Sequence, residues 1–117
     1  MNSGDQGRQA EDRACDYLQQ QGLQLLQRNY RSKRGEIDLI MQHEGQLIFV
    51  EVRFRRQSQF GNAAESVDWR KQAKLVACAQ HYIQTHRQVQ QQPCRFDVVA
   101  LNGNNLALEW IPNAFSA

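Results

Sequence analysis

GEIDLIMQHEGQLIFVEVRFR, residues 35–55, sets three carboxylates and an arginine inside two otherwise apolar segments. Each segment is rich in Ile, Leu, Val and Phe, a composition that favours β-strands. The Glu44–Gly45 pair between them is typical of a hairpin turn. Taking these two as the central turn residues fixes which residues of the strands oppose each other, and a longer turn would shift that register.

This register gives the hairpin one wholly apolar face and one mixed face. On the mixed face Asp38 opposes Glu51, and like charges placed opposite each other destabilise an antiparallel pair. A divalent cation such as Mg²⁺ or Mn²⁺, held by both carboxylates, would remove that cost. The alternative is a solvated face on which the two acids tolerate each other, but Ile40 and Phe49 on the same face favour a covered one. The predicted pairs are Ile37–Val52, Leu39–Val50 and Met41–Ile48 on the apolar face, and Ile40–Phe49, Asp38–Glu51 and Glu36–Arg53 on the mixed face.

The chain as a whole suits one soluble domain spanning residues 1–117, because its 41% hydrophobic and 22% charged residues are an ordinary globular composition. Cys15, Cys78 and Cys94 are widely spaced and odd in number, which argues against both a zinc site and a disulfide framework. The polar N-terminus lacks the apolar core of a signal peptide, and no apolar run is long enough to span a bilayer. We therefore expect a cytoplasmic protein that does not bind membranes.

Hydrophobic periodicity predicts two helices and further strands along the rest of the chain. Gly22 is a typical helix end, and Asp68 or Ser66 can cap the second helix. The predicted elements are a helix at 8–21, a strand at 23–30, hairpin strands at 36–41 and 46–54, a loop at 55–66, a helix ending about residue 87, a connector at 88–93 and strands at 94–101 and 106–111. Their order, αβββαββ, predicts an α/β fold with a central mixed β-sheet flanked by helices.

Glu11 is a further acid of interest on the first predicted helix. It precedes Ala14, Cys15 and Leu18 by three, four and seven residues, spacings that share a helix face. Glu11 therefore borders the buried stripe and can point toward the sheet. A glutamate in the first turn is equally expected from its interaction with the helix dipole, so both interpretations stay open.

Basic residues surround the acidic hairpin in sequence, although the net charge is only +2. Ten of the fourteen lysines and arginines fall within residues 28–34, 53–56 and 70–74. One basic run is usually just a solvated face, but three runs around a carboxylate pair can draw in a nucleic acid through its phosphates. A metal that acidifies a bound water beside such a phosphate supports phosphodiester hydrolysis. The predicted nucleic-acid contacts are Arg28, Arg31, Lys33, Arg34, Arg55, Arg56 and Lys74.

Asp38 on one strand and Glu51-Val52-Arg53 on the next resemble the PD-(D/E)XK nuclease signature. The chain is more closely similar to a small bacterial family that resembles archaeal Holliday junction resolvases, within the restriction-endonuclease-like superfamily. The stretches that carry the resemblance are Gly7, QAEDRA at 9–14, RN at 28–29, GEIDLI at 35–40, FVEV at 49–52, Lys71, Lys74-Leu75 and RFDVV at 95–99, which together span nearly all the chain.

The resemblance implies a restriction-endonuclease-like fold, metal ligation by Asp38 and Glu51, and Glu11 near the metal. By analogy with resolvases, it also implies a homodimer acting on DNA. Arg53 departs from the pattern because it stands where the superfamily has lysine, and an arginine cannot act as a base. Lys71 shares a predicted helix face with Leu75 and is a second cation that can reach the site.

Three hypotheses follow for the function. The first is a metal-dependent endonuclease acting on structured or branched DNA, with Asp38, Glu51, Arg53, Glu11 and Lys71 as its catalytic residues. The second is a non-catalytic nucleic-acid-binding module on a degenerate nuclease fold, which Arg53 favours. The third is a protein-interaction domain whose charges only keep it in solution. The sequence leaves open whether the protein is an enzyme.

Overall fold

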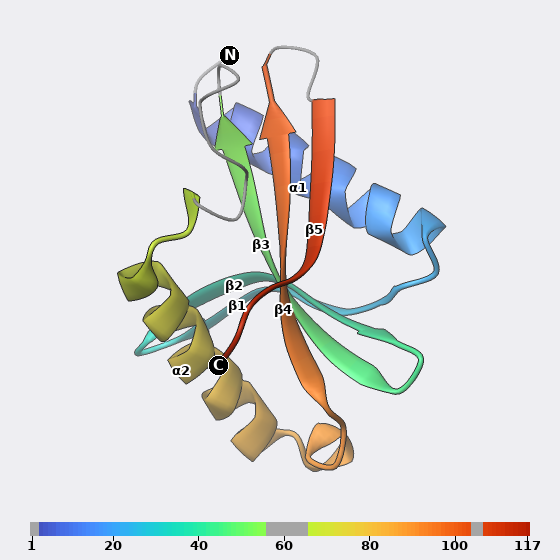
Figure 1. The fold of residues 1–117 in the computed structure, drawn as a ribbon, viewed down its shortest axis with the longest axis vertical. Coiled ribbons are helices and arrows are strands. Elements are labelled where there is room, and N and C mark those ends of the chain that lie inside the picture. The colour runs from blue at the N-terminus through green and yellow to red at the C-terminus, as the bar shows by residue number, and fades with distance from the viewer. Residues whose placement is uncertain (1–2, 56–65, 104–106) are drawn as a thin grey trace.

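One mixed sheet with a helix packed against each face forms the fold in a computed structural model that describes residues 3–55, 66–103 and 107–117 (Figure 1). The elements are α1 (Ser3–Gln20), β1 (Gln24–Ser32), β2 (Gly35–His43), β3 (Gln46–Arg55), α2 (Trp69–Thr85), a short 3-10 helix η2 (Arg87–Val89), β4 (Cys94–Asn102) and β5 (Ala107–Phe115). Over these described residues the sheet has five strands in the order β1-β2-β3-β4-β5. Only the β3–β4 pair among them is parallel, with α2 as its crossover. The predicted order αβββαββ and the mixed sheet are confirmed.

The predicted hairpin register is confirmed next to its turn. Glu44 and Gly45 have φ angles of 51° and 78°, and both central residues of a type I′ turn require such positive values. The ladder between β2 and β3 contains the predicted pairs Leu39–Val50, Ile40–Phe49 and Met41–Ile48.

The register prediction is wrong beyond Leu39–Val50, where the ladder between β2 and β3 ends. Ile37 packs in the same cluster as Ile40, whereas strict alternation would place the two on opposite faces. The irregularity faces Asn29 of β1, whose φ of 54° interrupts that strand between the Arg28–Leu39 and Tyr30–Ile37 pairs. The predicted ladder pairs Ile37–Val52, Asp38–Glu51 and Glu36–Arg53 therefore do not form.

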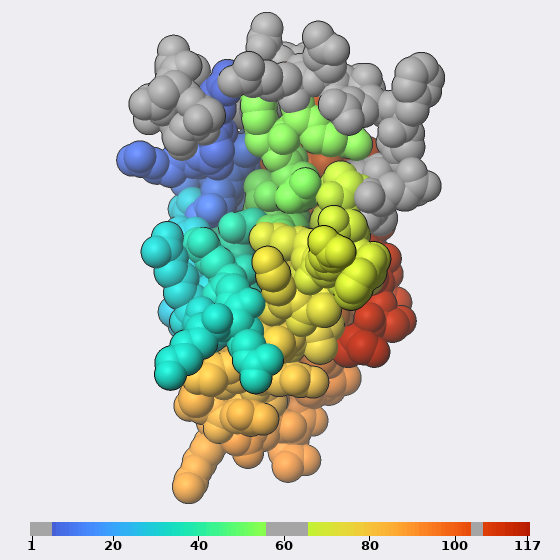
Figure 2. All heavy atoms as spheres, turned by 90° about the vertical axis from the view of Figure 1, so that its left-hand side faces the viewer, coloured from blue at the N-terminus to red at the C-terminus, as the bar shows by residue number. Residues whose placement is uncertain are grey.

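The turn between β1 and β2 lies beside α2 (Figure 2). Gly35 has a φ of 154°, which a residue with a side chain rarely adopts. A Cβ built on Gly35 would lie 3.6 Å from the Cβ of Lys74, and the Cys78 thiol donates a hydrogen bond to the Gly35 carbonyl at 3.5 Å. These contacts seat the turn on the middle of α2.

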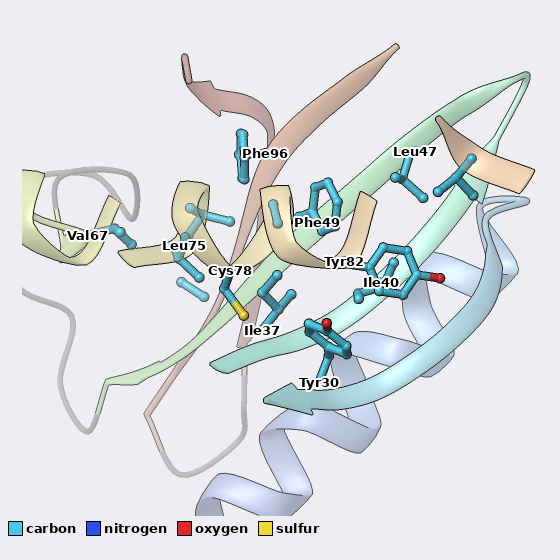
Figure 3. Close-up of a cluster of buried hydrophobic side chains, with 14 residues drawn as sticks. Tyr30, Ile37, Ile40, Leu47, Phe49, Val67, Leu75, Cys78, Tyr82 and Phe96 are labelled. Carbon is cyan, nitrogen blue, oxygen red and sulfur yellow. The ribbon is translucent and has the colours of Figure 1, made fainter. Parts of the chain in front are cut away.

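Two apolar clusters hold the helices against the sheet. Ala10, Ala14 and Leu18 of α1 pack on one face, against Leu39 and Val50 among others. The cluster under α2 is shown in Figure 3, and its members come from α2, from four strands, from η2 and from Val67 just before α2. Its larger buried side chains are Tyr30, Ile37, Ile40, Phe49, Leu75, Tyr82 and Phe96. The central strands are therefore covered on both faces, as predicted from their apolar content.

Two predicted element bounds are wrong by more than two residues. The first helix begins at Ser3 rather than residue 8, since Gly7 lies within the helix without ending it. The last strand reaches Phe115 rather than residue 111: Pro112 interrupts it, but Asn113, with a φ of 51°, donates its N–H to Asp97 and pairing resumes at Phe115. The predicted loop lies largely at 56–65, outside the described residues. No helix in the described part of the chain is long and apolar enough to cross a membrane.

Candidate active site

Asp38 and Glu51 meet where β2 and β3 separate. Because the ladder has ended, the N–H of Val52 is free to donate a 2.8 Å hydrogen bond to Asp38 Oδ2. Glu51 follows Phe49 on the β3 face that α2 covers, and it is only 4% exposed. Its Oε2 is buried without a hydrogen-bond partner, although Lys71 Nζ forms an ion pair with that oxygen at 3.2 Å.

The two carboxyl groups are electrostatically linked. Burial, the hydrogen bond to Glu51 and the negative charge of Glu51 together raise the pKa of Asp38 from 3.8 to about 8. The Val52 N–H and the Lys71 ammonium act in the opposite direction but do not cancel the effect. Near neutral pH and without a metal, this raised pKa favours the protonated form of Asp38.

Asp38 and Glu51 are the residues that could hold a metal ion. Both offer carboxylate oxygens, the donors preferred by Mg²⁺ and similar hard cations, and one of these oxygens lacks a hydrogen bond. Within the described ranges no group of three or more His, Cys, Asp or Glu residues could surround a metal. Two carboxylates are nevertheless sufficient for Mg²⁺, which usually keeps several waters or substrate oxygens.

Lys71 reaches the acidic pair from the first turn of α2. Asp68 caps this helix by accepting a 2.9 Å hydrogen bond from the Lys71 N–H. The cap fixes the start of α2, and Lys71 then faces the sheet together with buried Leu75. The structure thus brings Lys71 to Glu51, and its catalytic role stays a prediction.

Arg53 lies two residues beyond Glu51 on β3 and is half-buried. Its ladder partner is Ala100 of the parallel strand β4. Glu36, the residue predicted to oppose Arg53, instead pairs with Arg31 across β1 and β2 at 3.7 Å. The position of Arg53 beside Glu51 keeps it a candidate, and its role is untested.

Glu11 and Arg28 are bound to each other. Arg28 donates to Glu11 Oε1 at 2.9 and 3.2 Å and to Asp12 Oδ1 at 2.8 Å. These bonds raise the pKa of the guanidinium, the Asp12 bond most. Glu11 borders the buried stripe of α1, next to Ala10 and Ala14, but its carboxylate is bound to Arg28. The predicted place of Glu11 near a metal stays untested. Arg28 already pairs with two carboxylates, so its charge is less available to a nucleic acid.

Four of the predicted nucleic-acid contacts gather in one surface depression, which we call the basic hollow. Arg31 comes from the end of β1, Lys33 and Arg34 come from the β1–β2 turn, and Lys74 comes from α2. Arg55 is not among them: it bonds Asn102 at 2.7 Å and pairs with Glu109 at 3.6 Å. Arg56 lies outside the described residues. The basic hollow is lined by Arg31, Ser32, Lys33, Arg34, Gly35, Glu36 and Lys74.

Asp97 is a buried charge that sequence reasoning did not single out. It is fully buried, and it accepts hydrogen bonds from Arg95 at 3.0 Å, from Trp110 Nε1 at 3.0 Å and from the Asn113 N–H at 2.9 Å. Its position inside the apolar run CRFDVVAL was the available signal, because a buried charge must be paired. The contacts tie β5 to β4, which is a structural role.

The mixed sheet, the helix on each face and the αβββαββ order are compatible with a restriction-endonuclease-like fold. The family described as "Uncharacterised protein family UPF0102" matches residues 10–101, and the chain belongs to that family. A UPF0102 protein of Nitrosococcus oceani is 50% identical over 95% of this chain and 91% of its own length. UPF0102 proteins of Saccharophagus degradans and Pseudomonas savastanoi are 52% and 50% identical, over 94% and 95% of this chain and 92% and 93% of their own lengths.

Proposed function

We propose that this protein is a divalent-metal-dependent endonuclease acting on structured or branched DNA. One observation carries the proposal: the half-buried Asp38 and the buried Glu51 lie against each other, and one Glu51 oxygen lacks a hydrogen bond. Holding two such acids together costs stability in the absence of a cation. A site that retains this cost in the middle of a sheet is a candidate for function.

In this proposal, four residues have separate roles in binding the metal and the phosphate. Asp38 and Glu51 would hold Mg²⁺ or Mn²⁺, which supplies an acidic bound water and charge stabilisation for the attacked phosphate. Lys71 is positioned to leave Glu51 for a phosphate oxygen or to orient the attacking water. Arg53 stays protonated and can bind phosphate, but it cannot accept the proton of the water.

A non-catalytic nucleic-acid-binding module is the second candidate. It is favoured by the Lys71 ammonium, which already neutralises Glu51 at 3.2 Å, and by the absence of a lysine at position 53. In this case the basic residues bind DNA, while the acidic pair is compensated by a proton and an internal cation.

Cleavage assays separate the two candidates. Single-stranded, duplex and four-way-junction DNA are incubated with the protein in Mg²⁺, in Mn²⁺ and in EDTA. We expect metal-dependent cleavage, greatest on the junction, that falls by about a hundredfold or more in Asp38→Asn. Asp16→Asn, an exposed aspartate on α1, is the matched control and should cleave as wild type does. DNA binding without cleavage in either metal would favour the binding module.

A further inference from the structure

The basic hollow has more positive charge than its own acids can neutralise. Its lining has four cations and one carboxylate, Glu36, which pairs with Arg31. In the part of the chain that the structure describes, no ion pair involves Lys33, Arg34 or Lys74. Three cations around a shallow depression repel one another, so the hollow is suited to an anion with several negative oxygens.

The hollow is held in shape by contacts below it. Gly35 lies against Lys74 of α2, and the Cys78 thiol bonds the Gly35 carbonyl. Ser32 and Gly35 pair across the turn, and the Ser32 hydroxyl accepts from the Arg34 N–H at 3.1 Å. The backbone that carries the cations is thus fixed relative to α2.

The same helix connects the hollow to the acidic pair. Lys71 contacts Glu51, and Lys74 lines the hollow one turn further along α2. Residues three apart share a helix face and are separated by a rise of about 4.5 Å. Phosphates of one strand in a duplex recur about every 3.4 Å along the axis. A backbone seated in the hollow can therefore continue past Lys71 within a few nucleotides.

We propose that the basic hollow is a sequence-independent phosphate-binding subsite, in which Lys33, Arg34 and Lys74 hold the DNA strand whose neighbouring phosphodiester reaches Asp38 and Glu51. The proposal rests on the proposed function for that second phosphodiester, whereas binding in the hollow needs no metal. Arg28 and Arg55 are excluded from this subsite, because carboxylates and Asn102 already occupy their guanidinium groups.

Fluorescence anisotropy in EDTA tests the subsite without cleavage. Fluorescein-labelled DNA of two unrelated sequences is titrated at several salt concentrations with wild type, Lys33→Ala/Arg34→Ala and Lys74→Ala. We expect equal affinities for both sequences and roughly tenfold weaker binding by the double variant. We also expect the log–log salt slope to fall by about 0.9 for each phosphate that a variant no longer neutralises. Arg8→Ala/Arg87→Ala removes two exposed cations elsewhere and should retain the wild-type slope.

Three results would overturn the subsite. The first is wild-type protein that binds neither DNA, and the second is a Lys33→Ala/Arg34→Ala variant with wild-type affinity and slope. The third is an acidic peptide that displaces the DNA as well as unlabelled DNA of equal charge does. Failure of the proposed endonuclease is a different result: DNA binding that depends on the hollow, with no cleavage when Mg²⁺ or Mn²⁺ is restored.

Discussion

Asp38 is the residue at which local structure and chemistry meet. Its carboxyl group takes the Val52 N–H that the broken ladder releases, and this bond holds it against Glu51. A partly ionised pair in this environment is stabilised by a proton, by Lys71 or by a metal. The protonation of Asp38 should therefore be visible in the stability of the metal-free protein.

Asp38 predicts a pH dependence of folding stability in EDTA. The pKa of Asp38 is about 8 in the folded protein, whereas an unperturbed aspartate, as in the unfolded chain, has a pKa of 3.8. Between these two pH values the folded state therefore binds the proton more tightly than the unfolded state does. The free energy of unfolding should fall as the pH rises from about 4 to about 8. Urea unfolding at pH 5 and pH 8 measures this loss. Asp38→Asn should reduce it, Asp16→Asn should keep it, and an equal loss in Asp38→Asn would contradict the assignment.

Arg53 predicts a difference between two substitutions. Arg53→Lys keeps a cation beside Glu51 and adds a group that can exchange a proton, so we expect metal-dependent cleavage to be kept or raised. Arg53→Ala should weaken both DNA binding and turnover. Anisotropy, cleavage and melting are measured on both variants. If Arg53→Ala changes only the melting temperature, Arg53 is structural and not part of the site.

At the scale of elements, the seating of the β1–β2 turn on α2 depends on Gly35. Its φ of 154° makes any side chain there unfavourable, whereas Gly7 lies in α1 with nothing within 4 Å of a built Cβ. We expect Gly35→Ala to destabilise the protein by about 1–2 kcal/mol and Gly7→Ala to stabilise it by about 0.5–1 kcal/mol. Chemical denaturation measures both. Changes of the same sign would show that backbone conformation does not set the cost at Gly35.

The elements themselves were largely predictable because their signals are local. The Glu44–Gly45 turn fixes the hairpin register nearby, and Asp68 fixes the start of α2. The failures depend on contacts between distant segments. β2 changes face between Leu39 and Ile37, opposite Asn29 of β1 with its positive φ, and no pattern within either strand encodes that irregularity. The continuation of β5 beyond Pro112 likewise depends on a carboxylate of β4.

The candidate site was predictable in part for the same reason. Asp38 and Glu51 stand out as charges inside apolar strands, and the face of Lys71 follows from helical spacing. The pairing of Arg28 with Glu11 and Asp12 joins α1 to β1, so sequence alone could not separate this arginine from the free cations of the hollow. Charge along the chain predicts a basic surface, while the three-dimensional pairing decides which of its members are available.

At the scale of the whole molecule, a metal at Asp38 and Glu51 would join β2, β3 and α2, because these elements contribute the pair and its internal cation, Lys71. A ligand that binds only the folded state stabilises it by mass action, by about 2.7 kcal/mol at a hundred times its Kd. We therefore expect Mn²⁺ or Mg²⁺ to raise the melting temperature of wild type and to leave that of Asp38→Asn unchanged.

Substitution of Lys71 tests whether this rise in melting temperature comes from a metal bound at Glu51. Its ammonium lies 3.2 Å from Glu51 Oε2 and would repel a cation bound there, so Lys71→Met should bind metal more tightly and show a larger melting shift at the same metal concentration. Without metal the variant should be less stable, because Glu51 loses its counter-charge in a buried position. Lys74→Met, one turn away in the basic hollow, should respond to metal as wild type does. Melting curves over a series of Mn²⁺ concentrations measure these shifts for both lysine variants. Equal shifts in the two variants would mean that the metal binds away from Glu51.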